Sequence, residues 1–401
     1  MNSELYSNNR KCLAAGIDRI IVLSAYKSVQ RRGDLSFSFE QEANFWYVTG
    51  IEEPDWWVII DAMAQKSWLV APEVDEVHRV FDGSLSWDEA KRISGIDTVL
   101  SREDAKLLLE KLATKHDTVY TLGPDPHEKN YSFAVNPAQA NMRKMLKKMF
   151  ATVADCRQDL AKLRAIKRPH EIAVMEKAVA LTVSAFADIK EKLPTLPTEY
   201  QVEAEFSYAF RRSGAKGHAY DPIVAGGANA CTLHYTSNQD PLPANGLLLI
   251  DIGARVDGYA ADITRTHAIG TPTDRQKAVH AAVERAHHAI IALLKPGLDV
   301  REYHKAVDSI MKHELVGLGL MKSVDDEAGY RTYFPHAISH GLGIDVHDSL
   351  GRPDTFVPGM VLTVEPGIYI PEEGIGVRIE DDILITDTGH RNLSAALPTS
   401  L

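Results

Sequence analysis

The stretch GLLLIDIGARVDGYAADITRT, residues 246–266, has the pattern of a β-hairpin with a carboxylate on each strand. An apolar run ends at Asp251, Asp257-Gly258 is a strong turn signal, and a second strand begins near Asp262. A hairpin folded there makes Asp251 and Asp262 opposite or diagonal neighbours, with Cβ atoms roughly 5–8 Å apart. Carboxylates among apolar residues repel each other unless a positive charge lies between them.

A second stretch, VLTVEPGIYIPEEGIGVRIEDDILIT at residues 361–386, repeats this arrangement. Its turn is PEEG at 371–374, with proline early and glycine last. Glu365 and Glu380 are equidistant from the midpoint of that turn. This hairpin therefore also predicts one carboxylate from each strand at the same place.

Between the two hairpins, FPHAISHGLGIDVHD at residues 334–348 holds His336, His340 and His347. Each piece alone has a plainer interpretation, since hairpin acids often decorate a surface and single histidines are often core or surface residues. Both hairpins and the histidines in one half of the chain favour a metal centre of four carboxylates and one imidazole. Such oxygen-rich ligands suit Mn, Co, Fe or Zn. Two bridged ions, roughly 3.5–4 Å apart, would generate hydroxide at neutral pH.

Composition limits the class of protein. The 401 residues are 45% hydrophobic, which predicts a large core and two domains. The net charge of −11 and the lack of a basic stripe argue against nucleic acid as a partner. The chain has no apolar signal-peptide core after its first residues and no apolar run that could span a bilayer. Three scattered cysteines suggest no disulfide framework, so we expect a cytoplasmic protein without membrane partners.

The organisation of the chain predicts an accessory domain at 1–157 and a catalytic domain at 158–401. The first part has a helical stretch beginning at Ser101 and strand-like runs at 19–25, 56–62, 67–72 and 118–123. Pro169 suits the first turn of a helix. The second part alternates long helices with strand pairs, and we expect His287 and His288 to be exposed on one such helix.

These residues together resemble the Xaa-Pro peptidases of the creatinase/methionine aminopeptidase superfamily. The matching pieces are RAIKRPHEIAVMEKA (164–178), YDPIVAGGANACTLHYTSN (220–238), both hairpins and the histidine stretch. NFWYVTGIEEPDWWVII, residues 44–60, is similar to the accessory domain of aminopeptidase P. The resemblance implies an α/β (α+β) protein with an N-terminal creatinase-like α/β domain and a C-terminal pita-bread catalytic domain.

The resemblance also implies a ligand set for two divalent metal ions, with Mn²⁺ expected and Co²⁺, Zn²⁺ or Fe²⁺ as alternatives. The five positions that match ligands are Asp251, Asp262, His340, Glu365 and Glu380. Asp251 matches the chelating carboxylate, while Asp262 and Glu380 match those that bridge the ions. His340 and Glu365 match the residues that complete the second ion's shell.

Four further positions match residues around the substrate. His347 matches a histidine that stabilises the tetrahedral intermediate, and His336 one that lines the pocket. His234 matches a histidine on the substrate side, and Arg378 an arginine that supports the bridging carboxylate. Glu365 would also pass a proton from the nucleophile to the leaving nitrogen.

The implied activity is that of an Xaa-Pro aminopeptidase, in which a hydroxide activated by two metals cleaves peptides with proline at the second position. A prolidase that cleaves Xaa-Pro dipeptides is the alternative, with Arg352 as a carboxylate anchor. A metal-free creatinase-like hydrolase and a non-catalytic relative lack the ligand set present here. A homodimer or homotetramer is expected, in which Trp46 borders a substrate channel. Plain core packing is the alternative for Trp46.

Overall fold

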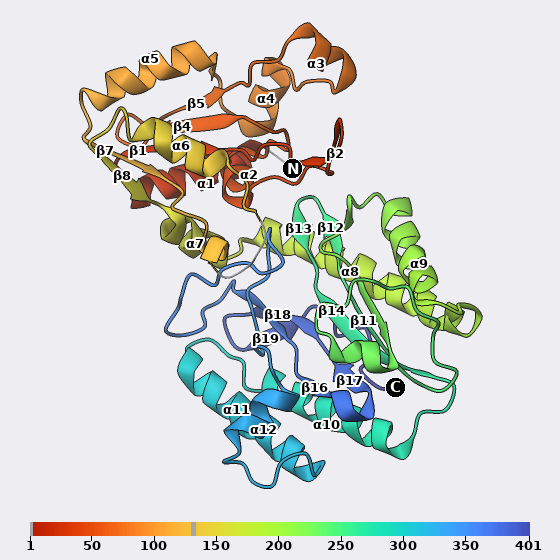
Figure 1. Ribbon diagram of the computed structural model, residues 1–401. Coiled ribbons are helices and arrows are strands. Elements are labelled where there is room, and N and C mark those ends of the chain that lie inside the picture. The colour runs from red at the N-terminus through yellow and green to blue at the C-terminus, as the bar shows by residue number, and fades with distance from the viewer. Residues whose placement is uncertain (1–2, 130–133) are drawn as a thin grey trace. The chain divides into compact units, whose positions relative to one another are not determined.

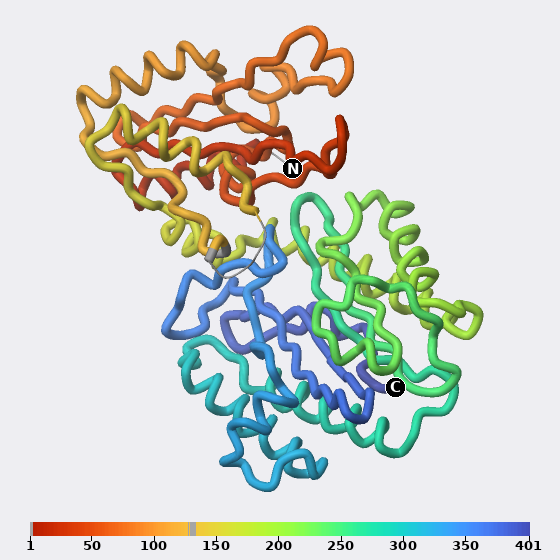
Figure 2. The backbone as a smooth tube through the Cα atoms, in the orientation of Figure 1, coloured from red at the N-terminus to blue at the C-terminus, as the bar shows by residue number. Residues whose placement is uncertain are grey.

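The computed structural model describes residues 3–129 and 134–401 (Figures 1 and 2). The chain divides into two compact units, Met1–Leu163 and Arg164–Leu401. Helix α7 (Arg157–Ala165) contains this division, and the boundary expected from the sequence lies at the start of the same helix.

The first unit is built on a six-stranded sheet with strand order β6-β5-β4-β1-β7-β8. Its strands are β1 (Ile20–Ser24), β4 (Trp57–Asp61), β5 (Lys66–Val70), β6 (Val99–Leu100), β7 (Thr118–Thr121) and β8 (Thr152–Asp155). The four strands predicted from the sequence are confirmed as β1, β4, β5 and β7. A short hairpin, β2 (Gln30–Arg32) with β3 (Leu35–Ser36), lies outside this sheet.

Helices cover the sheet through apolar contacts. Ser101 caps α5 (Arg102–Ala113), as predicted, by accepting a hydrogen bond from Asp104 N. Leu109 of α5 and Leu146 of α6 (Ala138–Leu146) are fully buried in one cluster with residues of β1, β4 and β7. The other helices are α1 (Ser3–Gly16), α2 (Ala43–Thr49), α3 (Glu76–Phe81) and α4 (Trp87–Ser94).

Trp46 occupies a core position in this unit. All seven residues of α2 are buried, and the Trp46 side chain is 5% exposed. Its indole packs edge-on against Tyr6, with ring centroids 5.7 Å apart. A residue that borders a substrate channel needs an accessible ring, so this burial favours core packing instead.

The second unit combines four long helices with short sheets (Figure 1). The helices are α8 (Pro169–Lys192), α9 (Glu199–Arg212), α10 (Asp274–Ile291) and α11 (Val300–Gly317), with the shorter α12 (Glu327–Tyr333). Pro169 is the first residue of α8, as predicted. Helices α8 and α9 share a core with β10 (Ile223–Gly226), β11 (Gly246–Ile252) and β14 (Ile263–Ile269).

Helices α10 and α11 share a second core with the C-terminal strands. These strands are β15 (Val361–Val364), β16 (Gly367–Ile370), β17 (Ile375–Arg378) and β18 (Asp381–Ile385), and β19 (His390–Asn392) pairs with β18. The remaining strands are β9 (Gly217–His218), β12 (Ala254–Val256) and β13 (Tyr259–Ala260). The two cores place one pair of helices behind each predicted hairpin.

The first hairpin folds at the predicted turn. Asp257 and Gly258 have φ values of 45° and 84°, the left-handed conformation that a two-residue hairpin turn requires. Asp251 pairs with Thr264, so Asp262 is its diagonal neighbour, as predicted. Gly253 is needed in this hairpin because a Cβ there would lie 1.7 Å from Ala261 O.

The second hairpin keeps one register along its whole length. Gly367 pairs with Arg378 in β16 and β17, and Val364 pairs with Asp381 in β15 and β18. Both pairs have the same midpoint, so Glu365 lies opposite Glu380, as predicted. In residues 3–129 and 134–401, no helix is both long and apolar enough to cross a membrane.

Candidate metal centre

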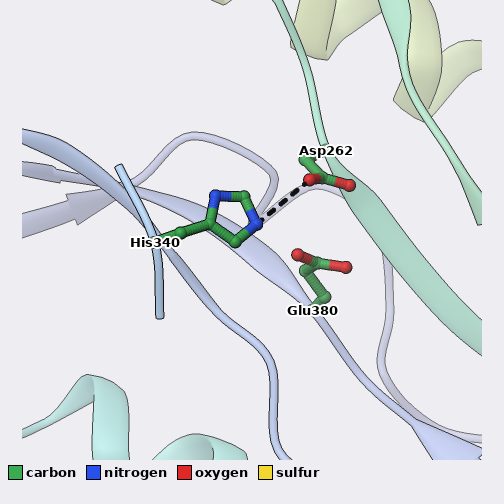
Figure 3. Close-up of side chains that lie close together, drawn as sticks. All are labelled: Asp262, His340 and Glu380. Atoms are coloured by element: carbon green, nitrogen blue, oxygen red, sulfur yellow. Dashed lines mark ion pairs between the residues drawn. The ribbon is translucent and has the colours of Figure 1, made fainter. Parts of the chain in front are cut away.

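The hairpins and the histidine stretch converge on one cluster (Figure 3). Asp262 precedes β14, Glu380 precedes β18, and His340 lies in the loop before β15. One donor atom from each of these three residues lies within 4.8 Å of the others. His340 Nε2 is 3.5 Å from Asp262 Oδ2 and 3.3 Å from Glu365 Oε1. The structure thus brings four of the predicted ligands together.

Asp251 reaches the cluster as its fifth member and is held from two sides. Tyr220 donates its hydroxyl to Asp251 Oδ1, and Arg378 donates Nη2 to Asp251 Oδ2, both at 2.5 Å. The charge of Asp251 acts on both Asp262 and Glu380. All five predicted ligands therefore share one electrostatic site.

The electrostatics of this site disfavour a full set of ionised carboxylates unless positive charge accompanies them. Burial and the charges of neighbouring carboxylates raise the pKa of Glu380 well above its usual value. Burial is likewise the main cause that raises the pKa of Asp262, and it raises that of Glu365 to about 7. Burial opposes the charge on His340, but Asp262 and Glu365 outweigh it and raise its pKa to about 9. Protons thus offset the repulsion here, and divalent ions could replace them.

Two threonines orient the glutamates. Thr363 donates its hydroxyl to Glu365 Oε1 at 2.8 Å and accepts the backbone N–H of His340. Thr264 donates to Glu380 Oε2 at 2.6 Å and accepts from Arg378 Nε at 3.2 Å. Arg378 is therefore linked to Glu380 through the Thr264 hydroxyl.

The other three predicted residues lie near the cluster. The His347 ring is 4.2 Å from that of His340, centroid to centroid, and the residue is exposed. His336 Nε2 lies 2.9 Å from the Tyr369 hydroxyl, and its Nδ1 is 3.6 Å from Glu365 Oε2. Burial lowers the pKa of His336 to about 4, with Arg378 and His234 among the smaller causes. His234 is exposed but close enough to act on His336.

Sequence reasoning missed several residues of the site. Thr264 and Thr363 lie two residues from Asp262 and Glu365, so strand alternation could have placed them on the same face. Asp382 is fully buried and accepts the backbone N–H of Asp262 at 3.1 Å. Tyr220 had no signal in its spacing, because it comes from a loop before β10.

The expectation for His287 was wrong. Its side chain is 1% exposed, with Nε2 3.3 Å from Asp381 Oδ2. Arg265 Nη2 donates to the same carboxylate at 2.6 Å. The helical pattern could not reveal this, because the face of α10 that carries His287 packs on a strand from a distant part of the chain. His288 is exposed, as predicted.

A largely buried group of four carboxylates and one histidine, in or next to strands backed by paired helices, is the kind of site found in metal-dependent hydrolases. Residues 173–387 match the model of the family Metallopeptidase family M24. Residues 6–120 match the model of the family Aminopeptidase P, N-terminal domain. The chain belongs to metallopeptidase family M24.

Individual relatives agree with this assignment. The Xaa-Pro aminopeptidase of Escherichia coli (strain K12) is 36% identical over 403 residues, covering 94% of this chain and 90% of the relative. Xaa-Pro aminopeptidase 3 of Homo sapiens is 32% identical over 410 residues, covering 96% and 80%. The structure of aminopeptidase P from E. coli with the inhibitor Pro-Leu has a TM-score of 0.89 and 32% identity, covering 100% and 96%. The two-domain α/β fold, with its pita-bread catalytic domain, is confirmed.

Proposed function

We propose that this protein is a metal-dependent Xaa-Pro aminopeptidase, which hydrolyses the bond between an N-terminal residue and a following proline. The observation that carries the proposal is the convergence of Asp251, Asp262, His340, Glu365 and Glu380 on one buried site. The likeness to Xaa-Pro aminopeptidases covers nearly the whole chain, including the accessory domain, and supports the same conclusion.

The five residues would hold two divalent ions, with Asp262 and Glu380 between them. Their oxygen-rich donor set supports Mn²⁺ as the metal, and Co²⁺, Zn²⁺ and Fe²⁺ suit the same ligands. When bound, the ions would provide a hydroxide at neutral pH and polarise a peptide carbonyl.

The chain's own residues would bind the peptide and move its protons. Glu365 would take a proton from the attacking water and give it to the imino nitrogen of proline. His347, beside His340, would donate a hydrogen bond to the oxyanion. His336 and His234 would face the proline ring, which offers no N–H and must be recognised by shape. The edge-on contacts of His336 with Phe334 and Tyr369 support an aromatic surface there.

A comparison of peptide lengths tests this proposal. We expect a peptide such as Ala-Pro-Ala to be cleaved with a higher kcat/KM than Ala-Pro. Ala-Ala-Ala is the control, because it has no proline at the second position. A clear preference for the dipeptide would identify a prolidase instead. Turnover that survives exhaustive chelation would support the metal-free creatinase-like alternative, and no turnover with any metal would support a non-catalytic relative.

The partners, the location and the oligomeric state of the enzyme are also proposals. Short peptides with proline at the second position are the partners that the site suits. The acidic net charge and scattered cysteines favour the cytoplasm and no nucleic-acid partner. A homodimer or homotetramer is proposed, and light scattering of the purified protein would measure it.

A further inference from the structure

Glu199 is a buried carboxylate that the metal centre does not use. It is the first residue of α9, and its side chain is fully buried. Oε1 accepts from Gly226 N at 2.9 Å and from Asn229 Nδ2 at 3.0 Å. Oε2 accepts from the Tyr235 hydroxyl at 2.9 Å and from Asp240 N at 3.0 Å. One carboxylate thus ties both ends and the middle of the segment 226–240.

A second glutamate on the same helix face strengthens this tie. Glu203 lies one helical turn beyond Glu199, and its Oε2 accepts from Asn238 Nδ2 at 2.9 Å. Asn238 is 1% exposed, has a φ of 47°, and accepts from Val224 N at 2.9 Å. The end of the segment is therefore fixed in a conformation that most residues avoid.

The beginning of the segment 226–240 packs against β17. A Cβ on Gly376 would lie 2.3 Å from Ala230 O, so only glycine allows this approach of the two backbones. Cys231 Sγ also donates to Ile375 O at 3.4 Å. Gly376 lies two residues before Arg378, which donates a hydrogen bond to Asp251 in the candidate metal centre.

His234 lies within the segment that these contacts hold. It is exposed, next to Tyr235, and close enough to act on His336. We propose that Glu199 is a positioning residue, which holds the segment 226–240 so that His234 stays at the substrate side of the metal centre. This inference rests on the proposed function, because it assigns His234 to substrate binding.

The chemistry of the carboxylate makes the proposal testable. Each oxygen of Glu199 accepts two hydrogen bonds, and all four donors are N–H or O–H groups. In Glu199→Gln the amide nitrogen cannot accept, so two of these donors lose residue 199 as an acceptor and face another donor. The volume of the side chain hardly changes, so this variant removes acceptors and little packing.

The kinetic test compares Glu199→Gln, His234→Ala and the double variant on Ala-Pro-Ala. If Glu199 acts through His234, Glu199→Gln should raise KM about tenfold, with kcat changed by less than about twofold. In the His234→Ala background, the same substitution should have no further effect on KM. Additive effects, or loss of metal from Glu199→Gln, would overturn the proposal. Glu205→Gln is the control, because Glu205 lies on the same helix but pairs with Lys192 instead.

A second measurement separates this proposal from the proposed function. Amide hydrogen exchange of residues 226–240 should be about tenfold faster in Glu199→Gln and unchanged in Glu205→Gln. If the wild-type protein leaves Xaa-Pro peptides intact, the proposed function is refuted. If exchange is unchanged in Glu199→Gln, the proposal that Glu199 holds the segment 226–240 is refuted. If Glu199→Gln does not fold, Tyr235→Phe replaces it in the kinetic and the exchange measurements. This variant removes the hydroxyl that donates to Glu199 Oε2.

Discussion

Glu365 and Glu380 lie opposite each other, yet neither backbone N–H pairs across the hairpin. Glu365 N donates to Ile338 O, and Glu380 N donates to Thr264 O, both at 3.0 Å. Ile338 is two residues before His340, and Thr264 is two residues after Asp262. The hairpin therefore opens where both strands carry a carboxylate, and each glutamate is tied to the segment that supplies another proposed ligand.

Glu380→Gln and Asp251→Asn should abolish binding of two metals and activity while the protein stays folded. Glu380→Gln removes a negative charge from a buried cluster of carboxylates that repel one another, so it should not weaken the metal-free fold. Asp251→Asn also removes the partner of the buried Arg378, so we expect it to stay folded with a lower free energy of unfolding. Elemental analysis after dialysis, together with circular dichroism, measures both effects. Wild-type turnover in either variant would refute the ligand assignment.

Thr264→Val should weaken metal binding without changing a proposed ligand. The hydroxyl orients Glu380 and links it to Arg378, and loss of such supporting groups typically lowers metal affinity about 10–100-fold. Thr266→Val is the matched control, because Thr266 is also buried in β14 but donates to Arg378 O. Competition with a chelator of known affinity compares the two. Equal affinities in both variants would contradict an orienting role.

Acid should destabilise the fold partly through His267. Burial lowers the pKa of His267 to about 3, whereas the unfolded chain binds a proton near pH 6.5. The contribution is fully present above pH 6.5 and is lost as the pH falls from 6.5 towards 3, because only the unfolded state gains the proton. Between pH 6.5 and 5 this loss is about 2 kcal/mol, which His267→Gln should lack. Urea melts at both pH values measure the difference, and equal losses would contradict this assignment.

Asp348→Asn should destabilise the second unit strongly. Arg164 Nη2 is 2.9 Å from Asp348 Oδ1, and Lys167 Nζ is 3.7 Å from Oδ2, with all three side chains buried. Loss of this charge removes the carboxylate that pairs with the buried Lys167 and one of the two that pair with Arg164, at a cost of about 3–5 kcal/mol. Asp345→Asn is the control, because Asp345 also pairs with Arg164 but is 54% exposed and should cost at most about 1 kcal/mol. Similar unfolding free energies for both variants would contradict the burial argument.

Arg352→Ala should leave cleavage of Xaa-Pro-Yaa peptides nearly unchanged. Arg352 is exposed and has a φ of 56° in the loop between His347 and Met360. If it anchored the free carboxylate of a dipeptide, its loss would instead raise KM selectively for Ala-Pro. Parallel assays with Ala-Pro and Ala-Pro-Ala distinguish the two roles.

Local patterns predicted the hairpins correctly because turn residues and strand alternation are short-range properties. Asp257-Gly258 and the symmetry about PEEG placed both carboxylate pairs at the observed registers. The support of these carboxylates was not predictable in this way, since Tyr220 and Arg378 reach Asp251 from segments far apart in sequence. The prediction that His287 is exposed was wrong for the same reason. Its burial depends on contact with Asp381 of β18, which the pattern of a single helix cannot reveal.

The contact between Thr264 and Glu380 also has a consequence for how the protein folds. Each hairpin is local, but this contact joins residues 116 positions apart. Closing so long a loop costs entropy and slows assembly, so each hairpin can form before the two meet. Their meeting brings carboxylates together that must take up protons or a cation, and this requirement should slow the last step when no divalent ion is present. We therefore expect an added divalent metal ion to accelerate the final refolding phase, so that binding of the metal and completion of the fold are linked.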